Sequence, residues 1–240
     1  MEKTYFDLIA DEILEVMLSI PLLHEIADLN HKQLVLFTTQ FYQFVKNFPR
    51  YLGALIWKFP DENIRFALAN NLVDEVGGFA HLEKMDRTAT HPALFRRFAL
   101  TLNITEEQMN NAQPRPYTQK MLDTLDNLFI HSHYIKAIGG LAPGMESIFN
   151  TWIDLVLQGL RKTQRYSEKE LLFFSLHTIV DEEHSEIIKV NLLDYLSDEE
   201  NKKFLKEGAY TTVNAQKEFF LNLTEEIKTL THHPDLAIHC

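Results

Sequence analysis

The feature that most constrains the fold is the absence of proline between Gly144 and His233, more than a third of this 240-residue chain. Proline interrupts helices, so a long stretch without it is free to form them. Near the start of the stretch, apolar residues recur at helical spacing, namely Phe149, Ile153, Val156, Leu157 and Leu160. The stretch therefore predicts three long helices, with joints near Arg165–Ser167 and Leu196–Ser197.

Helical periodicity also dominates the remainder of the chain. One apolar stripe consists of Phe6, Ile9, Ile13 and Met17, and further helices are expected over about 31–46, 61–76, 92–102 and 118–138. Asp61 is the expected cap of one of them, and Gly139-Gly140 with Pro143 is expected to break the chain. With only 8 glycines and 8 prolines, the sequence predicts an all-α bundle of about eight helices. It is expected to form a single domain over 1–230 with a frayed tail, 231–240.

Composition argues against several kinds of partner. Lys and Arg number 23 and Asp and Glu 34, so the formal charge is 23 − 34 = −11, which disfavours nucleic acid or an anionic membrane surface. No run approaches the roughly 18 apolar residues of a membrane span, and the N-terminus has no segment of signal-peptide type. The one cysteine, Cys240, cannot form an internal disulfide, so a reducing cytoplasm is the expected location.

The strongest chemical signal is the segment LHTIVDEEH, residues 176–184. His177, Asp181 and His184 stand at i, i+4 and i+7, which on an unbroken helix fall near 0°, about 40° and about −20° around the axis. Three metal-ligand side chains would then share one face, and the spacing Asp181-x-x-His184 is one that helical bundles use for paired metals. Alone, the segment also fits a polar surface with two histidines.

The same helical geometry separates the other residues of this region into solvent-facing acids and apolar neighbours. The acids expected in solvent are Glu182, Glu183 and Glu186. Apolar surroundings are expected from Phe173, Phe174, Val180, Ile187 and Ile188.

Two glutamates lie on apolar helical stripes. Glu146 falls in line with Ala142 and Phe149, where a buried, unpaired carboxylate is costly. The alternative is a glutamate that only stabilises a helix N-terminus. Glu75 ends the stripe of the helix over 61–76, just before Gly77-Gly78, and a negative charge at a helix C-terminus favours a nearby cation. Here the alternative is a frayed surface acid.

Together these segments offer two glutamates, one aspartate and two histidines on separate helices. Carboxylate with imidazole suits iron, manganese or zinc, and the absence of cysteine argues against a structural zinc site. Five or six ligands suit two metals better than one. The same ligands also fit a dinuclear metal hydrolase, and a large acidic bundle also fits a helical binding or regulatory module without turnover.

The order of four motifs resembles a known family. NNLVDEVGG, HPALFRRFALTLNIT, MES and HTIVDEEH look like the haem-oxygenase-like di-iron oxidases and oxygenases, relatives of the chlamydial protein associating with death domains. The stretch FYQFVKNFPRYLGAL is similar to that family's second-helix region. The resemblance spans roughly 30–190 and implies the fold shared with thiaminase II and pyrroloquinoline-quinone synthase. It also implies a homodimer.

The resemblance implies a ligand set. The family's metal ligands fall on Glu75, His91, Glu146, His177, Asp181 and His184, with Glu75 and Glu146 also assigned catalytic roles between two iron ions. His81 lies in the loop that follows Glu75 and is the alternative to His91. The activity implied is an O₂-dependent oxidation of a small organic substrate, whose identity the sequence does not give.

The sequence departs from particular branches of the family. The branch that makes p-aminobenzoate from its own side chains has a lysine where Val156 stands, and residues 11–31 hold no tyrosine. The thiaminase-like branch needs a central cysteine, which Cys240 cannot supply. A haem oxygenase would need a first-helix histidine such as His24, but that reading leaves the other motifs unexplained. Aromatic residues expected in the core, with some at the substrate pocket, are Phe41, Tyr42, Phe44, Phe149 and Trp152. Arg50, Arg96 and Arg97 are candidates to bind a substrate carboxylate.

Overall fold

The described residues of the computed structural model, 3–78, 85–178 and 181–232, form helices and connecting turns without any strand. The helices are α1 (Tyr5–Leu18), α2 (Pro21–His24), α3 (His31–Val45), α4 (Phe48–Lys58), α5 (Glu62–Glu75), α6 (His91–Thr101), α7 (Glu106–Asn111), α8 (Pro116–Asp126), α9 (Tyr134–Leu141), α10 (Ser147–Lys162), α11 (Leu172–His177), α12 (Asp181–Leu192) and α13 (Glu199–His232). The predicted all-α class is therefore confirmed. No helix of this part of the chain is long and apolar enough to cross a membrane.

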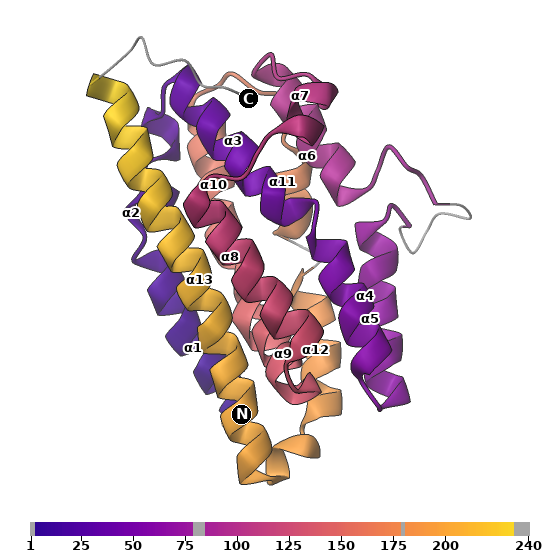
Figure 1. The fold of residues 1–240 in the computed structure, drawn as a ribbon. Coiled ribbons are helices and arrows are strands. Elements are labelled where there is room, and N and C mark those ends of the chain that lie inside the picture. The colour runs from indigo at the N-terminus through magenta and orange to yellow at the C-terminus, as the bar shows by residue number, and fades with distance from the viewer. Residues whose placement is uncertain (1–2, 79–84, 179–180, 233–240) are drawn as a thin grey trace.

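The long helix α13 runs the length of the bundle and packs along α9, α8 and α1 (Figure 1). On the other side, α5 packs between α4 and α12, and α6 packs on α3 and α11. The apolar faces of these helices meet in one continuous core rich in buried aromatic rings. The stripe predicted on the first helix is part of that core, since Phe6, Ile9, Ile13 and Met17 are all buried.

Side-chain caps fix where several helices begin. Asp61 caps α5 by accepting from the backbone N–H groups of Asn63 and Ile64, as the sequence predicted. Thr90 caps α6 and Pro92 occupies its first turn, so His91 stands at the first helical position. These caps matter for function because residues at helix ends carry the candidate site.

The helix expected over 118–138 is interrupted. α8 begins at Pro116 and passes into a π-helical turn, Asn127–His131, and α9 starts only after His133, whose Nδ1 accepts from the Ile135 N–H. Periodicity continues through such a turn, so sequence spacing did not reveal the break.

The break predicted at Gly139-Gly140 is wrong, because both glycines lie inside α9. A Cβ on Gly139 would stand 2.2 Å from the Leu205 carbonyl oxygen of α13, so this glycine serves close helix packing. Pro143 is accommodated in a π-helical segment, Ala142–Glu146, that leads directly into α10. A proline lacks the N–H and crowds the preceding turn, and a widened turn relieves both problems.

The proline-free stretch has the predicted joints, but its middle part is two helices. α11 ends at His177 and α12 begins at Asp181. The helix expected through this segment is therefore interrupted after His177, and the shared face of His177, Asp181 and His184 stays a prediction, because the side chains of Asp181 and His184 lie outside the described residues. Of the tail expected to fray, 231–240, only residues 231 and 232 are described, and both belong to α13.

Candidate metal centre

The turn after α5 brings a glutamate and a histidine together. Gly77 adopts φ +88°, and a Cβ there would lie 2.1 Å from the Asp86 carbonyl oxygen, so only glycine fits. The Asp86 N–H donates to the Gly77 carbonyl at 2.9 Å, which joins the two ends of the connection. As a result Glu75, the last residue of α5, and His91, the first of α6, lie with Oε1 and Nδ1 only 2.6 Å apart.

His177 completes the group from the end of α11. Its Nδ1 lies 2.6 Å from the carbonyl oxygen of Phe173. A carbonyl can only accept, so Nδ1 carries the proton and Nε2 keeps its lone pair. Such a hydrogen bond to the second ring nitrogen is the usual way that proteins orient a metal-ligating histidine.

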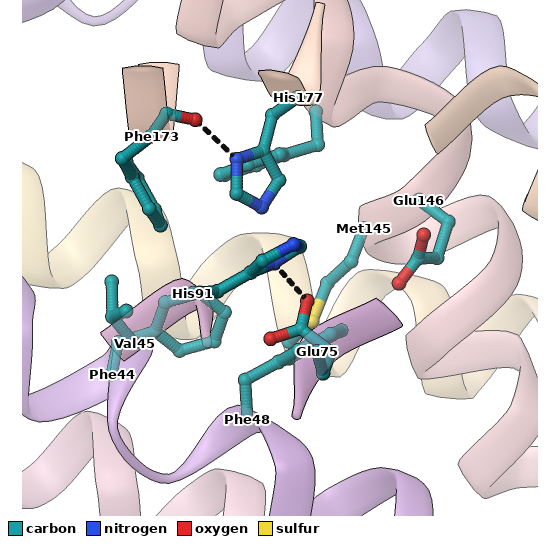
Figure 2. Close-up of a pocket in the computed structure, with 10 residues that line it drawn as sticks. Phe44, Val45, Phe48, Glu75, His91, Met145, Glu146, Phe173 and His177 are labelled. Atoms are coloured by element: carbon teal, nitrogen blue, oxygen red, sulfur yellow. Dashed lines mark hydrogen bonds and ion pairs between the residues drawn. The ribbon is translucent and has the colours of Figure 1, made fainter. Parts of the chain in front are cut away.

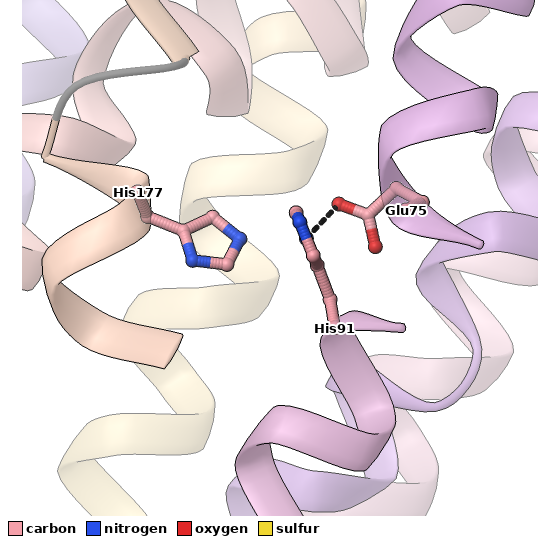
Figure 3. A group of neighbouring side chains, drawn as sticks. All are labelled: Glu75, His91 and His177. Atoms are coloured by element: carbon pink, nitrogen blue, oxygen red, sulfur yellow. Dashed lines mark ion pairs between the residues drawn. The ribbon is translucent and has the colours of Figure 1, made fainter. Parts of the chain in front are cut away.

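The three side chains converge inside the bundle (Figure 3). The rings of His91 and His177 lie 4.4 Å apart between centroids. One ligand atom from each of Glu75, His91 and His177 lies within 4.8 Å of the other two, which is close enough to share one cation.

Glu146 lies beside this group at the end of the π-helical segment (Figure 2). It lines the same cavity as Glu75, His91 and His177, although it is not part of the three-residue cluster. Each of these four side chains belongs to a residue no more than 5% exposed. A π-helical insertion often marks a functional position, since it changes the direction of a side chain relative to the helix around it.

The remaining wall of the cavity is apolar. It consists of Phe44, Val45, Phe48, Met145, Phe149 and Phe173. The cavity is small, about 30 Å³, and holds no more than about three waters. The carboxylate and imidazole groups therefore face a narrow, mostly apolar space.

The chemistry of the donor set fits a metal. The cavity has two carboxylates and two imidazoles, and no lysine or arginine lines it among the described residues. Buried carboxylates are costly without a cation to balance them. Oxygen and nitrogen donors without thiolate suit iron, manganese or zinc.

The structure places the predicted residues as follows. Glu75, His91, Glu146 and His177 line one cavity, whereas the side chains of Asp181 and His184, and residue His81, lie outside the described residues. Of the expected apolar neighbours, Phe173, Phe174 and Ile188 are buried, Ile187 is 40% exposed, and Val180 lies outside the described residues.

The aromatic and basic residues expected at the substrate pocket are only partly found there. Phe44 and Phe149 line the cavity, while Phe41, Tyr42 and Trp152 pack in the core without lining it. Arg96 donates to the Tyr42 hydroxyl at 2.7 Å and is absent from the lining, as are Arg50 and Arg97. His24 is exposed and bonded to the Leu18 carbonyl, so nothing places it at a haem.

Sequence reasoning missed the wall residues Val45, Phe48 and Met145. Helical spacing relates Phe48 to Phe44, and Met145 precedes Glu146, but neither pattern distinguishes a cavity wall from ordinary core. The Phe173 carbonyl was also missed, because a backbone acceptor leaves no trace in the sequence.

Comparison with known proteins places the chain in a family. The profile of a family described as iron-containing redox enzymes matches residues 35–217. The 4-aminobenzoate synthase of Chlamydia pneumoniae is 27% identical over 200 residues, which are 82% of this chain and 84% of that protein. The 4-chloro-allylglycine synthase of Streptantibioticus cattleyicolor is 26% identical over 169 residues, 70% of this chain and 62% of that protein.

Solved structures agree on the fold. A CADD-like protein from Nostoc punctiforme superposes with a TM-score of 0.76 at 16% identity, covering 92% of this chain and 98% of that one. A domain with a heme oxygenase-like fold from Shewanella denitrificans gives a TM-score of 0.76 at 14% identity, covering 97% of this chain and 95% of that one. At such identities the likeness concerns the fold alone.

Proposed function

The chain belongs to the family of iron-containing redox enzymes, and on that premise we propose that it is an O₂-dependent, non-haem oxidase or oxygenase that uses two irons on a small organic substrate. The family makes it an oxidoreductase-type enzyme. The observation that carries the finer proposal is the convergence of Glu75, His91 and His177, with Glu146 beside them, in one buried cavity.

The residues have separate tasks in this proposal. Glu75, His91 and His177 hold iron at one end of the cavity, and Glu146, with Asp181 and His184 as the further candidates, completes the set for a second ion. The Phe173 carbonyl keeps the Nε2 lone pair of His177 directed at the metal. Iron bound there supplies the binding and reduction of O₂.

The apolar wall sets the conditions for chemistry. Phe149 and Phe173 contact the His177 ring at centroid distances of 5.0 Å and 4.4 Å, which fixes that ring and excludes water around it. In a dry pocket, charge interactions are stronger and side reactions with water are suppressed. Substrate specificity then depends on how the side chains of Phe48 and Met145 rearrange to admit a ligand.

The substrates of the relatives cannot be assigned directly to this chain. Two are synthases of 4-aminobenzoate and of 4-chloro-allylglycine. Val156 stands where the branch that makes p-aminobenzoate from its own side chains has a lysine. We therefore propose a substrate that is supplied from outside the chain. Amino acids, fatty acids and amines form the panel to test. The homodimer and the cytoplasmic location expected from the sequence stay predictions.

Anaerobic iron loading tests the proposal. Wild-type protein should bind close to two Fe²⁺ per chain and develop a visible absorbance when O₂ is added. His177→Ala should lose most of the iron, whereas His131→Ala, at an exposed histidine, should retain it. Equal occupancy in both variants would discredit the site.

Two other outcomes point to other functions. Turnover of an ester or phosphate without O₂ supports the dinuclear hydrolase. Absence of metal uptake together with tight binding of a protein partner supports the module without turnover.

A further inference from the structure

A buried asparagine lies one helical turn before Glu75. Asn71 is 2% exposed on α5, and its side-chain nitrogen Nδ2 has no hydrogen-bond partner among the described residues. Buried amide donors are nearly always paired in folded proteins. An orphan donor in this position is therefore suited to pair with an acceptor close to it.

The spacing makes Glu75 the acceptor within reach. Residues four apart on a helix lie on the same face, and their side chains can hydrogen-bond. Asn71 and Glu75 belong to the buried face of α5 together with Ile64, Ala67 and Leu68. The apolar members of that face offer the amide no acceptor.

Glu75 is one of the candidate metal ligands, and its Oε1 lies 2.6 Å from Nδ1 of His91. Carboxylates that ligate a metal are usually held in place by hydrogen bonds from neighbouring donors. The buried amide of Asn71, one turn earlier on the same helix face, is placed to supply such a bond.

We propose that Asn71 is a positioning residue of the metal centre, whose side-chain N–H donates to the Glu75 carboxylate when Glu75 holds a cation. The inference rests on the proposed function, since it requires a metal at Glu75 and His91. Asn71 acts through Glu75 and does not itself touch the metal.

Asn70 provides a matched control. It is the same residue type, adjacent on the same helix, and exposed. Asn71→Leu and Asn70→Leu are compared in two assays, thermal unfolding of the metal-free protein and anaerobic titration with Fe²⁺ or with Co²⁺, whose visible spectrum reports the ligand geometry.

The proposal predicts opposite effects in the two assays. Metal-free Asn71→Leu should unfold at the wild-type temperature or above it, because the substitution removes a buried orphan donor. Its metal affinity should fall about 10- to 100-fold, the usual effect of removing a partner of a ligand, with a changed Co²⁺ spectrum. Asn70→Leu should match wild type in affinity and spectrum, and Asn71→Ser, which keeps a donor, should recover part of the affinity.

Several results would overturn the inference. Wild-type affinity and spectrum in Asn71→Leu and Asn71→Ser remove it while leaving the proposed function intact. A metal-free Asn71→Leu that unfolds well below wild type assigns Asn71 a structural role instead. If wild-type protein itself takes up no Fe²⁺ or Co²⁺, the proposed function fails and the inference fails with it.

Discussion

Alanine at Gly77 should damage both stability and metal binding, because this glycine lies between Glu75 and the turn to His91. A Cβ there would stand 2.1 Å from the Asp86 carbonyl oxygen, whereas real Cβ contacts are essentially never under 3.0 Å. The two backbone segments that meet at this turn must therefore move apart by about 1 Å. The residue would also hold φ +88°, which costs an L-residue about 1–2 kcal/mol.

The separation also threatens the hydrogen bond from the Asp86 N–H to the Gly77 carbonyl, worth about 1 kcal/mol. The sum is roughly 2–3 kcal/mol. For a chain of this size each kcal/mol lowers the unfolding temperature by about 2–4 °C, so Gly77→Ala should unfold roughly 4–12 °C below wild type. Because the same displacement moves His91 relative to Glu75, iron affinity should fall as well.

Gly53→Ala is the control. Gly53 lies inside α4, and a Cβ there would meet nothing within 4 Å, so alanine should raise stability by up to about 1 kcal/mol through helix propensity. Differential scanning fluorimetry and iron titration on both variants check the prediction. Wild-type unfolding temperature and iron affinity in Gly77→Ala would refute the argument that this turn sets the distance between the two ligands.

Three further predictions concern pH, metal and cavity size. Burial acts to raise the pKa of Asp7, but hydrogen bonds from Lys189 and Thr4 lower it below its usual value. The ion pair of Asp7 with Lys189 therefore stabilises the fold at pH values above the pKa of Asp7 in the unfolded chain. This stabilisation is lost as the pH falls through the lower pKa of the folded protein. Asp7→Asn should therefore cost about 1 kcal/mol in urea unfolding at pH 7, and its difference from wild type should narrow below about pH 4. Fe²⁺ at 100 times its dissociation constant should stabilise wild type by about 2.7 kcal/mol, an increment that a chelator or His177→Ala should abolish. Met145→Ala should enlarge the cavity and lower the free energy of unfolding by about 2–5 kcal/mol, because Met145 is only 3% exposed. It should also extend turnover to bulkier members of the substrate panel, and unchanged selectivity would show that Met145 does not control access.

The helices could be predicted from sequence wherever one face meets the core. The stripe of α1 and the Asp61 cap of α5 depend on local spacing and local hydrogen bonds, which the sequence contains. The breaks could not be predicted in the same way. Gly139 reads as a turn residue, yet it is helical because the backbone of α13 passes against it, and a contact between residues 139 and 205 is invisible to local patterns.

The candidate ligands differ in how much of their placement the sequence alone could predict. Glu75 and Glu146 were predicted because a carboxylate on an apolar stripe is anomalous. His91 followed only from family resemblance, since it lies 16 positions after Glu75 and the turn that joins them is closed by Gly77 and Asp86. The end of α11 at His177 also escaped the periodicity, because His177 and Asp181 stand at helical spacing in the sequence.

The candidate ligands lie at helix ends, and this explains both the difficulty and the chemistry. Glu75 is the last residue of α5 and His177 the last of α11, so the C-terminal ends of both helices, which carry the negative pole of the helix dipole, lie beside the cavity. A glutamate in that position raises the free energy of the metal-free protein, and a divalent cation lowers it again by interacting with the carboxylate and the helix ends together. Because α5 and α11 direct their negative ends at one cavity, electrostatics here favours a cation over an anionic substrate group, and a substrate carboxylate would have to bind the metal itself.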